Sequence, residues 1–205
     1  MLKALLDALM DRRARQLIEH VGPWLPTTGP ILDLGSGTGH VSARIERERD
    51  IEVITADVTD IHVLGRPPVL VDDGVLPFDE ETFSAALLFF MLAYPKDPAG
   101  VLAEVARVTD GPIILVQSLH ANRLGYAWLR AREFFWTIVA FHVSKLLGYV
   151  PSEARFSMST RRFYTARDLQ RDVMAAGLRV RSRRERLVLR NGSLLIAGWL
   201  LERDG

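Results

Sequence analysis

The sequence contains no cysteine and no apolar segment long enough to cross a membrane. Without cysteine there is no disulfide framework, no thiolate nucleophile and no cysteine-ligated zinc or iron–sulfur cluster, and we expect no bound metal. The most apolar stretch, residues 134–144, has 11 residues, whereas a membrane-spanning helix needs about 20. Charged residues interrupt the first 15 positions before the apolar region of a signal peptide could form, so we expect a cytoplasmic protein.

The net charge is also small, at +1, and it conceals an uneven distribution. The 205 residues, 48% hydrophobic and 25% charged, are typical of one soluble globular domain over residues 1–205. Residues 31–110 carry 6 basic and 15 acidic side chains, a balance of −9, whereas residues 111–205 carry 16 basic and 7 acidic, a balance of +9. The acidic part disfavours a nucleic-acid partner. The basic part is compatible with an anionic substrate or with peripheral contact with a membrane surface.

Short apolar runs alternate with helical periodicity along the first two thirds of the chain. Apolar residues at helical spacing predict an N-terminal helix over residues 2–21 and further helices over residues 40–49, 98–108 and 166–176. Strands are predicted over residues 31–34, 51–57, 68–71, 85–90 and 113–116. Two strand-like runs, residues 178–190 and 194–201, flank Asn191-Gly192, a strong hairpin signal. The pattern predicts an α/β fold: a Rossmann-like doubly wound sheet of seven strands, mostly parallel, with a C-terminal antiparallel hairpin.

A glycine-rich turn follows the first predicted strand and reads Gly35-Ser36-Gly37-Thr38-Gly39. A dinucleotide-binding turn would place its third glycine at position 40, where this sequence has histidine, and no Gly-Lys-Ser/Thr of a nucleotide-triphosphate loop follows. The spacing therefore disfavours a nicotinamide-dependent oxidoreductase. It suits a ligand that needs close backbone approach without a pyrophosphate to hold.

Four motifs in order resemble the class I S-adenosylmethionine-dependent methyltransferases. They are ILDLGSGTGH at 31–40, the acid at 57 that ends the second strand, DDGVLPFDEETF at 72–83, and LAEVARV at 102–108 leading into the fifth strand. The resemblance covers roughly residues 30–118 and implies S-adenosylmethionine as cofactor, with S-adenosylhomocysteine as product. It departs from the family at Phe83-Ser84, where Phe-Asp is common. An Asn/Asp-Pro-Pro-aromatic motif after the fourth strand is also absent, which argues against methylation of nucleobase amines.

The resemblance assigns roles to residues at the carboxyl ends of the predicted strands. Asp33 would orient the glycine turn and help bind the cofactor's amino group, or merely cap the turn. Asp57 would accept hydrogen bonds from both ribose hydroxyls, or cap the following segment. Either Asp72 or Asp73 would contact the adenine amino group, and Phe90 would pack on the cofactor or in the core. The implied cofactor-binding residues are Asp33, Gly35, Ser36, Gly37, Gly39, Asp57, Val58, Asp72, Asp73, Gly74 and Phe90.

Methyl transfer is an in-line displacement, so a protein base is needed only when the acceptor is poorly ionised. The candidates for such a base are His120 and Ser118 after the fifth strand and Tyr94 after the fourth. Of these, we predict His120 and Tyr94 as the catalytic residues. A single histidine in a loop is often an ordinary surface or hydrogen-bonded residue, and this is the alternative interpretation of His120.

The parallel core does not require residues 119–165, which we interpret as a helical lid. This lid would follow the cofactor-binding core at 31–118 and precede a terminal helix and hairpin at 166–205. Residues 1–30 are expected to form an N-terminal cap helix. A helix over residues 124–149 is predicted to be apolar on most sides. It forms the acceptor lid, a helix packed on the sheet or in a dimer interface, or a membrane contact supported by Arg130, Arg132 and Lys145. The substrate-binding candidates are Tyr126, Trp128, Phe135 and Arg162.

The sequence therefore favours a methyltransferase that transfers the methyl group of S-adenosylmethionine to an O, C or N atom of a small, apolar or aromatic acceptor. The alternative is a noncatalytic cofactor-binding or scaffold protein that retains the fold. The expected partner is a small-molecule acceptor, and the sequence leaves both a monomer and a homodimer open.

Overall fold

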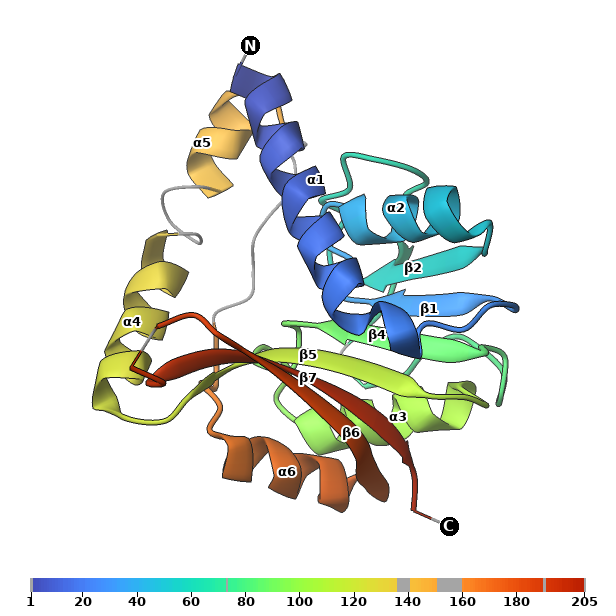
Figure 1. Ribbon diagram of the computed structural model, residues 1–205. Helices are drawn as coiled ribbons and strands as arrows, with labels where there is room; N and C mark the ends of the chain where they lie inside the picture. The colour runs from blue at the N-terminus through green and yellow to red at the C-terminus, as the bar shows by residue number, and fades with distance from the viewer. Residues whose placement is uncertain (1, 73, 136–140, 151–159, 190, 205) are drawn as a thin grey trace.

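Seven strands form one twisted sheet with helices on both faces (Figure 1). The computed structural model describes residues 2–72, 74–135, 141–150, 160–189 and 191–204. The strands are β1 (Ile31–Leu34), β2 (Val53–Asp57), β3 (Val69–Leu70), β4 (Ala85–Phe89), β5 (Ile113–His120), β6 (Leu178–Leu187) and β7 (Leu194–Arg203). The helices are α1 (Leu2–Val21), the 3₁₀ helix η1 (Gly22–Trp24), α2 (His40–Arg49), α3 (Pro98–Val108), α4 (Arg123–Phe134), α5 (Phe141–Leu146) and α6 (Ala166–Ala175).

The strand order is β3-β2-β1-β4-β5-β7-β6, with β1 to β5 parallel and the last two strands antiparallel. This confirms the predicted doubly wound sheet with a C-terminal hairpin. The register pairs Leu34 of β1 with Ala56 of β2 and Leu88 of β4. Asp57 and Phe89, one residue further along, therefore end their strands beside the glycine turn.

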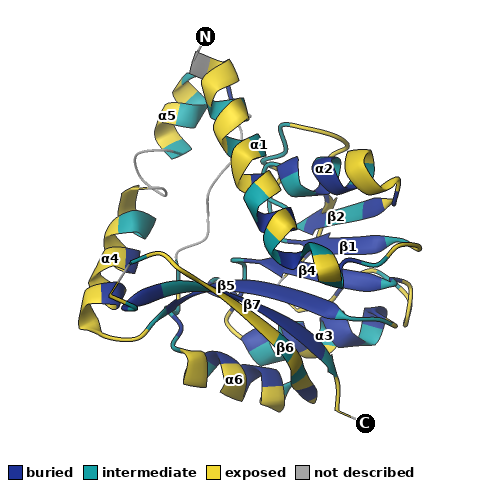
Figure 2. Ribbon diagram, viewed as in Figure 1, coloured by how far each residue is buried: buried dark blue, intermediate teal, exposed yellow. Residues whose placement is uncertain are grey.

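Alternate side chains of the central strands enter two separate apolar layers. Ile31 packs with α1 and α2 on one face, and Leu32 packs with α3 and α6 on the other. Because both faces are covered, every residue of β1 and β4 is buried (Figure 2). The apolar runs that predicted buried strands thus reflect burial on both sides.

Several elements differ from their predictions by one or two residues at an end, and three differences are larger. β5 continues to His120, not residue 116, because it pairs with β7 as far as the His120–Leu194 pair. The predicted helix over residues 124–149 is found as two helices, α4 and α5, of which α5 ends at Leu146; residues 136–140 lie outside the described residues. β6 ends at Leu187 and β7 begins at Leu194, so the connection between them is longer than the predicted two-residue turn.

The two edges of the sheet are both polar or short. β3 consists of two residues. β6 exposes five arginines, Arg179, Arg181, Arg183, Arg184 and Arg186, and a bulge interrupts its pairing with β7 between Val180 and Ser182. Arg183 and Arg184 stack on Trp199 and Trp24 at 4.6 and 5.6 Å from the ring centroids. Their aliphatic stems and flat guanidinium groups thus cover aromatic surface next to this edge.

Gly125 holds α4 against the β6–β7 connection, which leads to a stability prediction. A Cβ at this position would lie 1.9 Å from the backbone oxygen of Ser193. Alanine normally stabilises a helix by about 1 kcal/mol relative to glycine, but here we expect Gly125→Ala to lower the free energy of unfolding by about 1–3 kcal/mol through overpacking. Urea denaturation measures the difference.

Gly100→Ala in α3 is the comparison variant: its Cβ would approach only the carboxylate of Asp97, which caps α3 by accepting the Gly100 N–H, so we expect at most the loss of that cap, about 1 kcal/mol. A Gly125→Ala protein as stable as the unsubstituted chain would show that α4 is not held at Ser193.

Candidate functional site

The glycine turn places three residues in left-handed backbone conformations at the carboxyl end of β1. Gly35, Gly37 and Gly39 have φ values of 77°, 57° and 79°. A Cβ at Gly35 would lie 2.7 Å from the Cβ of Met91, and one at Gly39 would lie 2.6 Å from the backbone oxygen of Leu64. A Cβ at Gly37 would meet nothing within 4 Å. The outer glycines are therefore required for packing, whereas Gly37 leaves its backbone open toward free space.

Asp57 faces the glycine turn from the end of β2. Its Oδ2 accepts a hydrogen bond from the Gly37 backbone N–H at 2.9 Å, and its Oδ1 accepts one from the Thr59 N–H at 3.4 Å. Burial raises the pKa of this carboxyl, and the surrounding N–H donors oppose that shift. A carboxylate has about four acceptor positions, so Asp57 retains capacity for further donors beside the turn.

Asp33 lies inside β1 and is almost completely buried, with 2% of its surface exposed. Its Oδ2 accepts a hydrogen bond from the Ser42 hydroxyl of α2 at 2.5 Å. Burial raises the pKa of Asp33 to about 6; the Ser42 hydrogen bond opposes this shift, and the nearby charge of Asp57 adds to it. A buried carboxyl so poised stabilises a cation brought close to it. The sequence pattern did not indicate Ser42, whose contact arises from the packing of α2.

Ser36 is hydrogen-bonded to His62, which lies outside the sequence motifs. The Nδ1 of His62 lies 2.8 Å from the carbonyl oxygen of Arg66 and therefore donates to it, since a carbonyl only accepts. Its Nε2 then accepts the Ser36 hydroxyl at 2.8 Å. The Val63 N–H also donates to the Thr38 oxygen at 3.2 Å. The loop after β2 thus braces the glycine turn, a contact that no local sequence signal predicts.

The next residue after the turn, His40, connects it to two distant segments. His40 is buried, its Nδ1 lies 3.0 Å from the Thr38 hydroxyl, and its Nε2 lies 3.0 Å from Asp7 of α1. The Tyr149 hydroxyl, beyond α5, lies 3.3 Å from the same Nε2. His40 therefore fixes the start of α1 and the segment after α5 beside the glycine turn.

A narrow apolar cavity opens at the carboxyl ends of β1 to β4. Its lining consists of Leu34, Val58, Val71, Asp72, Gly74, Val75, Leu76, Met91, Pro95, Val101 and Glu104. Three of the predicted cofactor-binding residues, Val58, Asp72 and Gly74, thus share one cavity wall. Asp72 pairs with Val75 through an isolated antiparallel bridge, and Asp73 lies outside the described residues.

Tyr94 and His120 lie beyond the ends of β4 and at the end of β5. The Tyr94 hydroxyl donates to Oε1 of Glu133 on α4 at 3.3 Å, and Thr160 also donates to that oxygen. Burial and the charge of Glu133 raise the pKa of Tyr94 to about 12. The Nδ1 of His120 is buried without a hydrogen-bond partner in the described part of the chain. Tyr94 is therefore a hydrogen-bond donor near neutral pH, whereas His120 keeps an unused polar atom.

The four predicted acceptor-binding residues occupy different surroundings. Tyr126 makes edge contacts with His120 and Phe163, each with ring centroids 5.4 Å apart. Trp128 lies under the guanidinium of Arg132, and Phe135 at the end of α4 is half exposed.

Arg162 is turned away from these groups. Its Nη1 lies 2.5 Å from Asp172 Oδ2 of α6, and its guanidinium lies over the Tyr164 ring. The structure thus brings Tyr126 to His120, while the charge of Arg162 is neutralised by α6.

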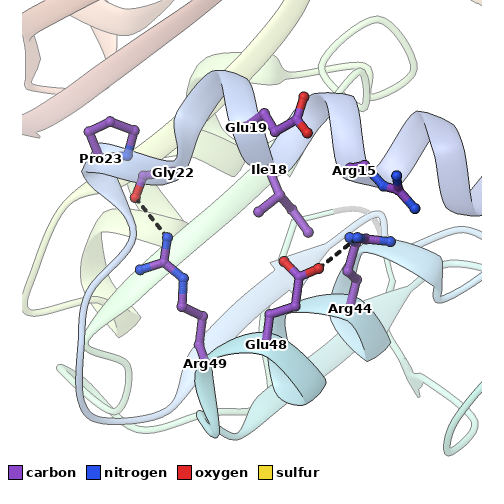
Figure 3. A pocket seen from close by; sticks show the side chains of 8 residues that line it. All are labelled: Arg15, Ile18, Glu19, Gly22, Pro23, Arg44, Glu48 and Arg49. Atoms are coloured by element: carbon purple, nitrogen blue, oxygen red, sulfur yellow. Dashed lines mark hydrogen bonds and ion pairs between the residues drawn. The ribbon is translucent and has the colours of Figure 1, made fainter.

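A larger hollow of about 610 Å³ lies between α1 and α2, toward the amino ends of the strands (Figure 3). Figure 3 shows its charged side chains engaged locally: Arg49 donates to the Gly22 oxygen at 3.4 Å, and Arg44 pairs with Glu48 at 2.6 Å. Ligands of doubly wound sheets bind at the carboxyl ends of the strands. We therefore assign the functional site to the opposite end, beside the glycine turn, although the cavity there is smaller.

The described residues contain neither a membrane-spanning helix nor a metal-binding cluster. No helix among them is both long and apolar enough to cross a membrane. No group of three or more histidine, aspartate or glutamate residues among them is arranged to hold a metal ion.

Solved structures resemble the chain over almost its whole length. The [4+2]-cyclase SpnF has a TM-score of 0.63 at 15% identity, with 94% of this chain and 81% of that chain covered. A putative methyltransferase from Bacillus halodurans C-125 has a TM-score of 0.59 at 15% identity, with 95% and 98% covered. Geranyl diphosphate C-methyltransferase from Streptomyces coelicolor A3(2), in complex with Mg²⁺, geranyl diphosphate and S-adenosyl-L-homocysteine, has a TM-score of 0.60 at 13% identity, with 98% and 82% covered. At sequence identities this low, the structural similarity shows the fold alone.

The family assignment comes from the sequence itself. A search of curated protein sequences found no significant match. Residues 6–183, however, match the profile of a family described as a methyltransferase domain. This range contains the glycine turn, Asp33, Asp57 and all of α1 to α6 except the start of α1. The chain therefore belongs to the methyltransferase domain family, and it is a class I S-adenosylmethionine-dependent methyltransferase.

Proposed function

We propose that this enzyme transfers the methyl group of S-adenosylmethionine to an O, C or N atom of a small acceptor bound over the carboxyl ends of β4 and β5. The observation that carries the proposal is the pairing of Gly37 and Asp57: an open glycine backbone bonded to a carboxylate that keeps acceptor capacity. The family likeness to geranyl diphosphate C-methyltransferase supports a small organic acceptor. Tyr126 and Trp128 of α4 would line the acceptor side of the site, which suits an apolar or aromatic body.

The residues beside the glycine turn fit the cofactor in chemistry. Asp57 would accept the ribose hydroxyls, Asp33 would face the cationic amino group, and the apolar cavity with Val58 and Asp72 would take the adenine. The cavity encloses about 40 Å³, roughly the volume of one or two water molecules. An adenine ring is larger than this space, so its binding would require the lining side chains to move. When bound, the cofactor supplies an electrophilic methyl group on its sulfonium.

The protein's own contribution on the acceptor side is orientation and water exclusion. Tyr94, with its pKa raised to about 12, keeps its proton near neutrality and is oriented by Glu133. His120 would accept a proton from an acceptor that has one to lose, but its unpartnered Nδ1 is buried, so this role requires that acceptor binding expose the imidazole. Tyr126 packs against that imidazole and fixes its plane.

Calorimetric titration with S-adenosylhomocysteine tests the cofactor half of this proposal. We expect saturable one-to-one binding by the folded protein, because the product keeps the ribose, adenine and amino groups that the site would hold. Absence of binding would refute the assignment of the site. When the carboxylates of the site are replaced, Asp79→Ala is the control for nonspecific charge effects. Asp79 is exposed and lies about 40 residues along the chain from the glycine turn.

Transfer of isotope-labelled methyl groups from S-adenosylmethionine to a panel of hydroxylated, amine and alkene acceptors tests the chemical half. Labelled product is the expected outcome. Binding of the cofactor without label transfer to any acceptor, together with a stable protein partner, would favour the noncatalytic alternative.

A further inference from the structure

Two arginines outside the predicted site approach each other across the acceptor side of the sheet. Arg13 lies in the middle of α1, and Arg132 lies in the last turn of α4. Figure 1 shows α1 crossing over the central strands and α4 standing where β5 ends. Apart from Phe90, the predicted cofactor residues lie on or directly after β1, β2 and β3, whereas the groups around these arginines, Phe90 and Ser118, come from the ends of β4 and β5. The pair therefore lies on the acceptor side of the glycine turn.

Arg13 is held by an aromatic face and not by an acid. Its guanidinium carbon lies 5.1 Å from the centroid of the Phe90 ring, directly after β4. In the described part of the chain Arg13 has no hydrogen bond and no ion pair, although Arg15 on the same helix pairs with Asp11. Burial and the positive charge of Arg132 lower the pKa of Arg13, while its surface stays open to solvent. Arg13 therefore presents a cation beside the Phe90 ring, and no acid among the described residues pairs with it.

Arg132 is placed similarly on the opposite side. Its Nη2 donates to the Ser118 hydroxyl of β5 at 3.1 Å, and its guanidinium carbon lies 5.7 Å from the Trp128 ring. Burial lowers the pKa of Arg132, and the neighbouring Glu133 and Tyr94 oppose that shift. Glu133 is within hydrogen-bond distance of Tyr94 and Thr160 but makes no ion pair with Arg132 among the described residues. The three charged groups together sum to +1.

Arg13 and Arg132 repel each other in partly desolvated surroundings, and because the Glu133 charge leaves the group at +1, a further anion between the two arginines would be favourable. A guanidinium stacked on a ring keeps its N–H edge free for a carboxylate or phosphate. We propose that Arg13 and Arg132 together bind an anionic group, a carboxylate or a phosphate, of the methyl acceptor, with the rest of that molecule against Phe90 and Trp128. This inference rests on the proposed function, because it specifies the acceptor of the same site.

The test uses small aromatic probes, of which benzoate and benzamide are similar in shape and differ in charge. Benzoate, phenyl phosphate and the uncharged benzamide are titrated into the full chain saturated with S-adenosylhomocysteine, and ligand-observed NMR gives the dissociation constants. We expect benzoate or phenyl phosphate to bind at least about 10-fold more tightly than benzamide, as one charge-assisted hydrogen bond would provide. The two anionic probes distinguish a carboxylate acceptor from a phosphate acceptor.

Three variants locate the binding. Arg13→Gln and Arg132→Gln should each abolish the preference for the anionic probes, and Arg13→Lys should retain part of it, because lysine keeps the charge without the planar fork. Arg12→Gln is the matched control: it makes the same change at the adjacent exposed position of α1 and should leave the preference intact. Melting temperatures verify that each variant is folded.

The results that would overturn the inference are distinct from failure of the proposed function. Equal binding of benzoate and benzamide, or of neither, overturns it, and so does a preference that survives in both glutamine variants. Loss of S-adenosylhomocysteine affinity in Arg13→Gln would assign that guanidinium to the cofactor and overturn it too. If the unsubstituted protein fails to bind S-adenosylhomocysteine, the proposed function fails, yet the same probe comparison without it still decides whether the arginines form an anion site.

Discussion

Replacing Asp57 by alanine is expected to lower the affinity for S-adenosylhomocysteine by about 100-fold or more. The carboxylate would accept both ribose hydroxyls, and a hydrogen bond to a charged group contributes about 1.5–3 kcal/mol, so losing two costs at least a factor of about 100. The variant also frees the Gly37 N–H, which Asp57 now accepts at 2.9 Å. Isothermal titration calorimetry measures the change.

Asp57→Asn separates the two roles of this side chain. Asparagine keeps one acceptor oxygen but loses the charge, so its affinity should lie between those of the unsubstituted protein and Asp57→Ala. Circular dichroism of both variants controls for a disturbed glycine turn. An Asp57→Ala protein that folds normally and binds within about 3-fold of the unsubstituted protein would contradict the ribose assignment.

Asp33→Asn is expected to make the free protein more stable above pH 6. The folded-state pKa of Asp33, about 6, lies above the ordinary value of 3.8. Between these values the folded chain holds a proton that the unfolded chain has released, so the free energy of unfolding falls as pH rises through this window and stays low above it. A shift of about two pKa units corresponds to roughly 3 kcal/mol, of which asparagine should recover roughly 1–3 kcal/mol.

Urea denaturation at pH 4 and pH 8 measures the effect. The gain should be present at pH 8 and absent at pH 4, because Asp33 is largely protonated in the folded protein at the lower pH. Asp79→Asn, an exposed carboxyl, should show no such dependence. A loss of stability at pH 8 would mean that the ionised Asp33 is stabilised by its surroundings.

This sign has a functional meaning. A buried carboxylate whose charge destabilises the free protein becomes favourable once a cation lies next to it. The amino group of the cofactor would supply that cation, so Asp33→Asn should combine higher stability with weaker cofactor binding.

Most of the fold could be predicted because its signals are local. The apolar runs at residues 31–34 and 85–89 and the helical spacing over residues 2–21 depend only on neighbours in the chain. The length of β5 could not be predicted, since its last residues are held by pairing with β7, about 80 residues later. The division of residues 124–149 into two helices also has no clear marker, because aromatic residues occur throughout that segment.

The candidate site divides along the same line. Motif spacing predicts Asp33, Gly37 and Asp57, which lie around the first βα connection. The contacts of Ser42 with Asp33, of His62 with Ser36 and of Arg13 with Phe90 depend on how helices and loops pack. These partners carry no spacing relative to the motif and become visible only in three dimensions.

The arginine-rich edge strand β6 has a consequence for how copies of this protein meet. A free sheet edge invites pairing with the edge of another molecule, and natural proteins prevent this with charges, bulges and short edge strands. Here the opposite edge ends in the two-residue β3, and β6 combines a bulge with five exposed cations. Two copies brought together along β6 would place these arginine-rich strands side by side, so strand-to-strand growth along this edge is disfavoured.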